Sequence, residues 1–203
     1  MKRNALRWLV VASLAWLAGC SDWRFNVVEN GVTYARIRVV RDGFRIGELA
    51  QDATIGGRAC RKGWVHLHAN GVPAGFTAAQ PFPLGPNTVP AGTWVFQNEA
   101  GVVTVCSFPR DIVIQGYPLR CSGGPKGVQT AFYPNGALRQ FYPQGRVLVG
   151  TIPCRARPFE PGIMLYENGR LRSAVLAADW EIEGKSCRQG ELIRLDPNGH
   201  LQP

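Results

Sequence analysis

The segment Tyr133-Pro134-Asn135-Gly136-Ala137-Leu138 returns in altered form twice more in the chain, as Tyr166-Glu167-Asn168-Gly169-Arg170-Leu171 and as Asp196-Pro197-Asn198-Gly199-His200-Leu201. A two-residue type I′ turn needs positive φ at both central residues, which Gly adopts freely and Asn tolerates. Asn-Gly or a close variant also occurs earlier, at Asn30-Gly31, Asp42-Gly43, Asn70-Gly71 and Ala100-Gly101. The sequence therefore predicts a series of β-hairpins closed by two-residue turns.

A column of aliphatic residues keeps an almost constant distance from these turns. One member follows each turn Gly at nearly the same interval, as Ile55 follows Gly43, and the members are Ile55, Leu84, Ile114, Leu148 and Ile182. Before each turn, alternate positions are mostly apolar and the positions between them are mixed, as expected for a β-strand with one buried face. Self-similarity with a period of roughly 30 residues predicts stacked supersecondary units.

We therefore expect an all-β fold, a repeat array of antiparallel hairpins that form an elongated, meander-like sheet. The array would occupy residues 46–203, preceded by leading hairpins within residues 20–45. A β-solenoid with one coil per repeat is the alternative, but turns that reverse the chain favour the meander. Length variation is confined to loops that should emerge at one edge and contact partners, roughly 58–63, 87–92, 117–127, 151–162 and 185–190.

The composition indicates one folded domain or one repeat array. The chain has 203 residues with 45% hydrophobic and 18% charged side chains. Its 24 Gly and 15 Pro argue against an all-helical fold. No CxxC, HExxH or Gly-x-Ser-x-Gly pattern occurs. His66 and His68 share a strand face near Cys60, but the equivalent positions of the other repeats hold unrelated residues. We therefore expect no enzyme activity, no catalytic residues, no metal and no cofactor.

The N-terminal segment has the pattern of a secretory signal, which we assign to residues 1–19. Lys2, Arg3 and Arg7 precede an apolar stretch at 8–18. This stretch is too short for a membrane-spanning helix, which needs about 20 residues. The segment ends in Leu17-Ala18-Gly19-Cys20, which resembles the bacterial lipobox.

The lipobox resemblance implies that Cys20 becomes the first residue of a mature lipoprotein and carries acyl chains such as palmitate, which anchor it to a membrane. In Gram-negative lipoproteins an Asp directly after the lipidated Cys favours inner-membrane retention, and Ser21 stands there in this chain. The resemblance therefore implies an outer-membrane lipoprotein that faces the periplasm, with the inner membrane and the cell surface as alternatives.

The three hairpin segments quoted first resemble the aromatic-x-Asn-Gly-x-Leu hairpins of bacterial MORN-repeat-like proteins. The units of those families are shorter, and Ala100 stands here in place of Asn. The resemblance implies an elongated β array that associates with proteins or membranes, and in some bacterial relatives an antitoxin or immunity role. It implies no catalytic residues.

Five cysteines follow Cys20, an odd number for an exported protein, so at least one thiol stays unpaired in the monomer. We predict that Cys60, Cys121, Cys154 and Cys187 form a repeat column. In a hairpin meander, equivalent residues lie two strands apart, about 9.6 Å, beyond the roughly 7 Å limit for a disulfide. The pairing that we predict is Cys106 with Cys121.

An arginine accompanies each cysteine of this column, and together they predict a ladder of positive charge along one edge: Arg61, Arg120, Arg155 and Arg188. Removal of the signal leaves 20 Lys and Arg against 14 Asp and Glu, a net charge of about +6. The hypothesis is that the ladder binds an anionic envelope component such as phospholipid or lipopolysaccharide. The alternative is that these arginines only keep the loop tips in contact with water and bind no partner.

The function expected from the sequence is that of a membrane-anchored lipoprotein, a noncatalytic envelope interaction or structural module. The first alternative is an immunity or antitoxin-like lipoprotein that binds one protein partner. The second is a glycan-binding lipoprotein that uses an aromatic face formed by Trp64, Trp94 and Trp180. Nucleic acid is not an expected partner, because the chain is exported and has no run of five basic residues.

Overall fold

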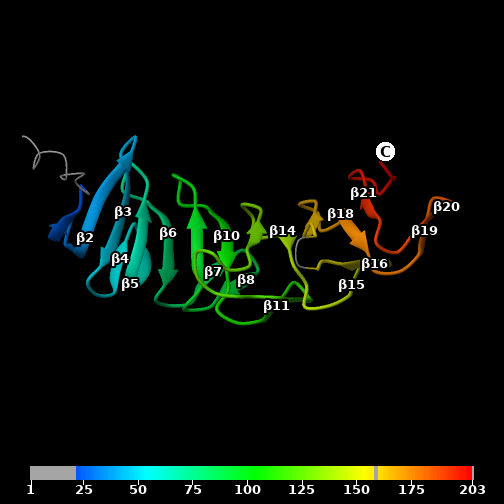
Figure 1. Ribbon diagram of the computed structural model, residues 1–203, viewed down its shortest axis with the longest axis horizontal. Helices are drawn as coiled ribbons and strands as arrows, with labels where there is room; N and C mark the ends of the chain where they lie inside the picture. The colour runs from blue at the N-terminus through cyan, green and yellow to red at the C-terminus, as the bar shows by residue number, and fades with distance from the viewer. Residues whose placement is uncertain (1–21, 158–159, 203) are drawn as a thin grey trace, which may run out of the picture.

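The computed structural model describes residues 22–157 and 160–202, so the signal segment and Cys20 lie outside the described residues. The described part is all-β and contains no helix, and therefore none that could cross a membrane. Fifteen of its 21 strands join into one antiparallel sheet. Figure 1 shows the array running from β2 at one end to β19 and β20 at the other.

Successive long strands of the sheet are joined as a meander. In order they are β1 (Arg24–Glu29), β2 (Val32–Arg41), β3 (Phe44–Leu49), β5 (Arg58–Leu67), β6 (Pro73–Ala78), β9 (Trp94–Gln97), β10 (Val103–Ser107), β13 (Thr130–Phe132), β14 (Leu138–Phe141), β17 (Ile163–Leu165), β18 (Leu171–Leu176) and β21 (Leu192–Arg194). The predicted hairpin meander is confirmed, and the β-solenoid alternative is wrong because neighbouring strands are antiparallel. The expected boundary after residue 45 falls inside β3, so the leading hairpins continue the same sheet.

After every second long strand, starting with β3, the chain forms a short hairpin before it enters the next long strand. Each of these is here called a rim hairpin. The five are β4 (Ala53–Ile55) with the first residues of β5, β7 (Phe82–Leu84) with β8 (Asn87–Val89), β11 (Ile112–Ile114) with β12 (Tyr117–Leu119), β15 (Val147–Val149) with β16 (Ile152–Arg155), and β19 (Trp180–Ile182) with β20 (Lys185–Cys187). The second strand of each rim hairpin occupies the first residues of a segment in which the sequence predicted a loop, so these predicted loops begin later than expected.

Each rim hairpin folds back across one face of the sheet. The tip of β11 and β12 reaches the turn at the far edge, where the Gln115 amide donates to the carbonyl of Gly136 and accepts from the N–H of Leu138. The aliphatic column lies buried against the sheet, at Ile55, Leu84, Ile114, Val149 and Ile182. This face, the inner face, therefore holds the core, and the opposite outer face remains open.

One member of the predicted aliphatic column was wrong by one residue. Leu148 is 62% exposed, and its neighbour Val149 is buried in the column position. The turn of this rim hairpin is Gly150-Thr151, so Val149 pairs with Ile152 as Ile55 pairs with Arg58. Because Val147, Leu148 and Val149 are all aliphatic, the sequence alone does not set the phase of the strand.

The prediction of two-residue turns is confirmed at Asn30-Gly31 and Asp42-Gly43, where both residues have positive φ. It is wrong for the five later turns, which are three-residue loops. At the first of them, the N–H of Gly71 donates to the carbonyl of His68, and the N–H of His68 donates to the carbonyl of Val72. The same pair of bonds recurs at 98–102, 133–137, 166–170 and 196–200.

In each of these loops the Gly alone has positive φ, as in a type I turn followed by a glycine bulge. The Asn serves through its side chain instead, since Asn135 Oδ1 accepts the N–H of Ala137. Ala100 lacks this group, and Asn98 replaces it by accepting the N–H groups of Ala100 and Val102.

In three of the five loops, the side chain of the residue that begins the loop connects neighbouring repeats. Tyr133 Oη donates to the carbonyl of Leu165 at 3.0 Å, and Tyr166 Oη donates to the carbonyl of Leu195 at 2.8 Å. His68 Nε2 lies 2.9 Å from the equivalent carbonyl, that of Gln97. These contacts form a turn ladder that joins residues 29 to 32 positions apart.

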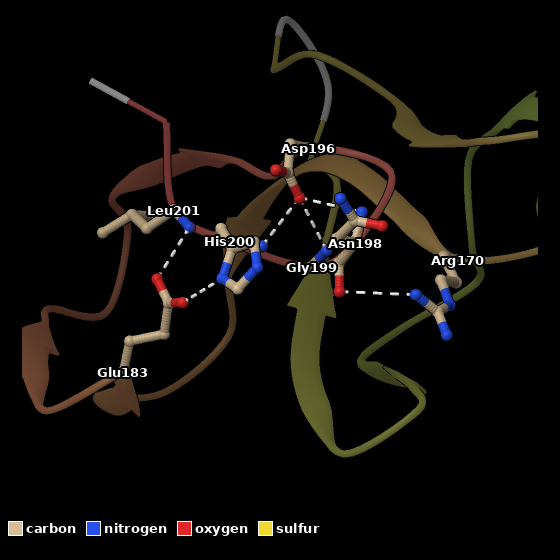
Figure 2. A network of polar contacts seen from close by, with 7 residues as sticks. All are labelled: Arg170, Glu183, Asp196, Asn198, Gly199, His200 and Leu201. Atoms are coloured by element: carbon tan, nitrogen blue, oxygen red, sulfur yellow. Dashed lines mark hydrogen bonds and ion pairs between the residues drawn. The ribbon is translucent and has the colours of Figure 1, made fainter.

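The last turn closes the array through a network of charged groups (Figure 2). Asp196 Oδ1 accepts the N–H groups of the following residues, Asn198, Gly199 and His200. Glu183, at the tip of the last rim hairpin, accepts the N–H of Leu201 at 3.1 Å and contacts the His200 ring. The terminal turn is thereby fixed to the rim hairpin beside it.

We expect Tyr133→Phe and Tyr166→Phe each to lower the free energy of unfolding by about 0.5–1.5 kcal/mol, because each leaves a carbonyl without its donor. The measurement is urea unfolding at equilibrium. Tyr117→Phe is the matched control, since no hydrogen bond of its hydroxyl occurs among the described residues. An equal loss in the control would contradict the contribution of the turn ladder.

We expect His200 to titrate above its ordinary pKa of 6.5, because its hydrogen bond to Glu183 favours the imidazolium, and the charges of Glu183 and Asp196 add to this effect. The His200 contact lowers the pKa of the Glu183 carboxyl below 4.5. The pair therefore stabilises the terminal turn most between these two ordinary values. The stabilisation is lost as pH rises through the raised His200 pKa and as pH falls through the lowered Glu183 pKa.

The measurement is an NMR titration of the His200 ring. Glu183→Gln should move the midpoint of His200 down toward 6.5, with a residual rise from Asp196. A midpoint unchanged by this substitution would show that the ion pair does not form in solution.

Candidate anion-binding site

The structure brings the four predicted arginines to equivalent positions. Each directly follows a buried residue in the second strand of a rim hairpin, and the pairs are Cys60-Arg61, Leu119-Arg120, Cys154-Arg155 and Cys187-Arg188. In the second repeat the position holds Pro90, after the buried Val89. The arginine column therefore exists in four of the five repeats.

The environments of these arginines differ. Arg61 and Arg188 are exposed, and Arg120 is half-buried. The side chain of Arg155 is only 12% exposed, lies 3.0 Å from Glu160 and donates through Nε to the carbonyl of Leu176. The edge is therefore not a uniform ladder of free charge, because Arg155 is already neutralised.

The predicted cysteine column needs one correction. Cys60, Cys154 and Cys187 are equivalent and buried, but the third repeat has Leu119 in that place and Cys121 lies two residues beyond it. The N–H of Cys121 donates to Asp111 at 2.8 Å, as the N–H of Lys62 donates to Asp52. Cys121 therefore occupies the position of Lys62.

The predicted Cys106–Cys121 bridge is not formed, and the five cysteines of the described chain are free. Cys106 lies on β10 in the core, between its neighbours Val95 and Thr130, whereas Cys121 follows β12 beyond the base of a rim hairpin. The short sequence separation of these two cysteines gave no information on their different placements.

Burial makes most of these thiols unreactive. Desolvation raises the pKa of Cys60, Cys106 and Cys154 to about 12. Desolvation and the neighbouring Asp111 raise the pKa of Cys121 to about 11. Because the thiolate is the reactive species, the fold protects Cys60, Cys106 and Cys154 from oxidation.

We expect iodoacetamide at neutral pH to modify Cys121 before the other described cysteines, since Cys121 alone is not fully buried. Among the five cysteines of the described residues, mass spectrometry of the folded chain should show at most one slowly modified site, and all five should react after unfolding in urea. Cys121→Ser should abolish the reaction of these five in the folded chain. Rapid modification of Cys60 or Cys154 in the folded chain would contradict their burial.

A pocket of about 820 Å³ lies on the outer face in the middle of the array. Its floor is Val105, Ala131 and Gln140, which are direct neighbours across β10, β13 and β14. The two longest insertions of the repeat, following β12 and β16, supply its walls with residues 127–129 and with Arg157, Glu160 and Pro161. The pocket therefore exists because two adjacent repeats carry long loops.

Three arginines line this pocket: Arg120, Arg139 and Arg157. None of them forms an ion pair with a carboxylate of the described residues. Glu160 is the one carboxylate among the lining residues, and Arg155 and the N–H of Arg157 already hold it, at 3.0 and 2.9 Å. Gln129, Gln140 and Tyr142 add neutral polar groups, so the pocket favours an anion.

The sequence indicated Arg120 but missed Arg139 and Arg157. Both stand outside the repeat column, and their role depends on loops that turn over the outer face. The signal that could have found them was the length of those two loops, which exceed the corresponding loops of the other repeats. We call the three arginines and the pocket that they line the arginine pocket.

The other sites considered from sequence do not assemble. The His66 ring packs edge-on against Trp94, with ring centroids 5.6 Å apart, and burial lowers its pKa. No group of three or more potential metal ligands occurs within residues 22–157 and 160–202. The tryptophans form no common platform, since Trp94 is buried and Trp180 lies on β19 in the last repeat.

Comparisons with protein-family models, with curated proteins and with solved structures find no match to this chain.

Proposed function

We propose that the chain is a lipid-anchored, noncatalytic module of the cell envelope, which binds an anionic envelope component in the arginine pocket. The lipobox resemblance around Cys20 supports the anchor, and the MORN-like hairpin array supports an interaction role. The observation that carries the binding part is the group of three arginines, without carboxylate partners among the described residues, around one pocket.

The chemistry of the pocket supports binding rather than turnover. Its lining in the described residues contains no Ser, Cys or His, and its single carboxylate is held in an ion pair. General acid–base or nucleophilic catalysis needs a group that is free to exchange a proton or attack. Guanidinium groups remain charged and donate in pairs to phosphate or carboxylate oxygens.

The size of the pocket supports a ligand of headgroup dimensions. Ligand pockets commonly have volumes of about 300–1,000 Å³, and this one has about 820 Å³. A lipid phosphate or the phosphorylated sugar of a lipopolysaccharide has the charge and the size to enter it. The exposed Arg61 and Arg188 would then contribute only long-range attraction.

The test is titration of the acylated protein, in detergent, with phosphatidylglycerol and with lipopolysaccharide. Arg120→Gln, Arg139→Gln and Arg157→Gln should each weaken binding about tenfold, the effect of losing one charge-assisted contact. Binding should also fall as the salt concentration rises. Arg110→Gln and Arg146→Gln are the matched controls, because both residues are exposed and lie outside the pocket.

The same titrations distinguish binding in the arginine pocket from binding at the exposed residues of the arginine column. Loss of binding in Arg61→Gln and Arg188→Gln, with the pocket variants unaffected, would transfer the site to the arginine column. A pull-down that returns one stoichiometric protein, with no binding of either lipid, would replace this proposal with an immunity-like role.

A further inference from the structure

The N-terminal end of the outer face carries a cluster of aromatic and cationic side chains, which we call the N-terminal patch: Trp23, Phe25, Arg36, Arg38 and Trp64. Phe25, Arg36 and Trp64 lie in one row across β1, β2 and β5, with Glu48 of β3 between the last two. Trp23 and Trp64 have ring centroids 6.0 Å apart. The Arg36 guanidinium lies over both rings, at 5.2 and 4.9 Å.

Two aromatic side chains of the patch are exposed to solvent. Phe25 is 64% exposed and Trp64 42%. Nine large apolar side chains are exposed in the described chain, and five of them lie on β1, β2 and β5: Phe25, Val28, Val39, Val40 and Trp64. The remaining four lie singly on rim hairpins and β21. Exposed apolar surface is therefore concentrated at the end of the array where the described chain begins.

The charges of the patch suit an anionic surface. Arg38 lies over the Trp23 ring at 4.8 Å and forms no ion pair with a carboxylate of the described residues. Arg36 is paired with Glu48 at 2.9 Å, and both side chains remain more than one third exposed. Tryptophan and arginine prefer the interface between water and lipid, since each combines an apolar body with a polar group.

The short chain segment between Cys20 and Trp23 determines what lies near this patch. Trp23 is three residues from Cys20, and three residues span at most about 11 Å. An acylated Cys20 would therefore hold the patch beside the headgroups of the leaflet that contains the acyl chains. Tethering at this distance gives even a weak surface contact a high effective concentration.

We propose that the N-terminal patch docks into the headgroup layer of the membrane that carries the lipid anchor. Trp23, Phe25 and Trp64 enter the interface, and Arg36 and Arg38 face the lipid phosphates. This inference rests on the proposed function, because it requires acylation of Cys20. It adds a second, noncovalent membrane contact, which sets the orientation of the array on the membrane.

The test uses the mature acylated protein in vesicles of phosphatidylethanolamine and phosphatidylglycerol, with brominated acyl chains that quench tryptophan. Flotation measures anchoring, and quenching measures docking. We expect quenched emission from the wild type and from Trp180→Phe, and loss of most of the quenching in the double variant Trp23→Phe with Trp64→Phe. That double variant should still float with the vesicles.

The arginines are tested in the same assay. The double variant Arg36→Gln with Arg38→Gln should lose most of the quenching and still float, whereas the control Arg110→Gln with Arg146→Gln should match the wild type. Floating wild-type protein without quenching overturns the docking and leaves the proposed anchor standing. Protein that does not float overturns both. The floating protein could instead cross-link through β1 into a dimer whose tryptophans are not quenched. That result would overturn the docking and assign the patch to contact with a second copy of the chain.

Discussion

A single antiparallel sheet can bury its apolar side chains only where a second layer covers them, and here the rim hairpins are that layer. Each hairpin places one aliphatic side chain and one further apolar side chain, such as Ile182 and Cys187, against the inner face. Full burial of such an aliphatic side chain contributes about 1.5–3 kcal/mol. Because every repeat supplies its own cover, one core cluster extends along the inner face from Val32 to Leu195, and the outer face stays free for contacts with other molecules.

The sequence predicted the features that depend on spacing and failed where one pattern suits two geometries. The interval from each turn Gly to the next aliphatic residue spans one long strand and the first strand of a rim hairpin. Because this interval is nearly constant, the meander could be predicted. Asn-Gly fits both a two-residue turn and a three-residue loop, and only the hydrogen bonds around His68 and Gly71 distinguish them. Consecutive aliphatic residues at Val147, Leu148 and Val149 likewise left the strand phase open.

The site was predicted in part for a similar reason. Arg61, Arg120, Arg155 and Arg188 follow the repeat, so their equivalence was visible in the sequence. The ion pair of Arg155 with Glu160 was not, because Glu160 lies in one of the two long loops, whose lengths and sequences do not follow the repeat. Arg139 and Arg157 meet Arg120 only where two long loops turn over the same stretch of sheet. Long-range loop paths leave no periodic trace in a sequence.

Strand length changes along the array. β2 has ten residues and β3 has six, whereas β13, β17 and β21 have three each. In a stacked chain each unit is held mainly by its neighbours, so shorter strands mean fewer bonds to break at each step. A mechanical load on the C-terminal end would peel hairpins away one at a time, while the longer strands near residue 22 remained paired.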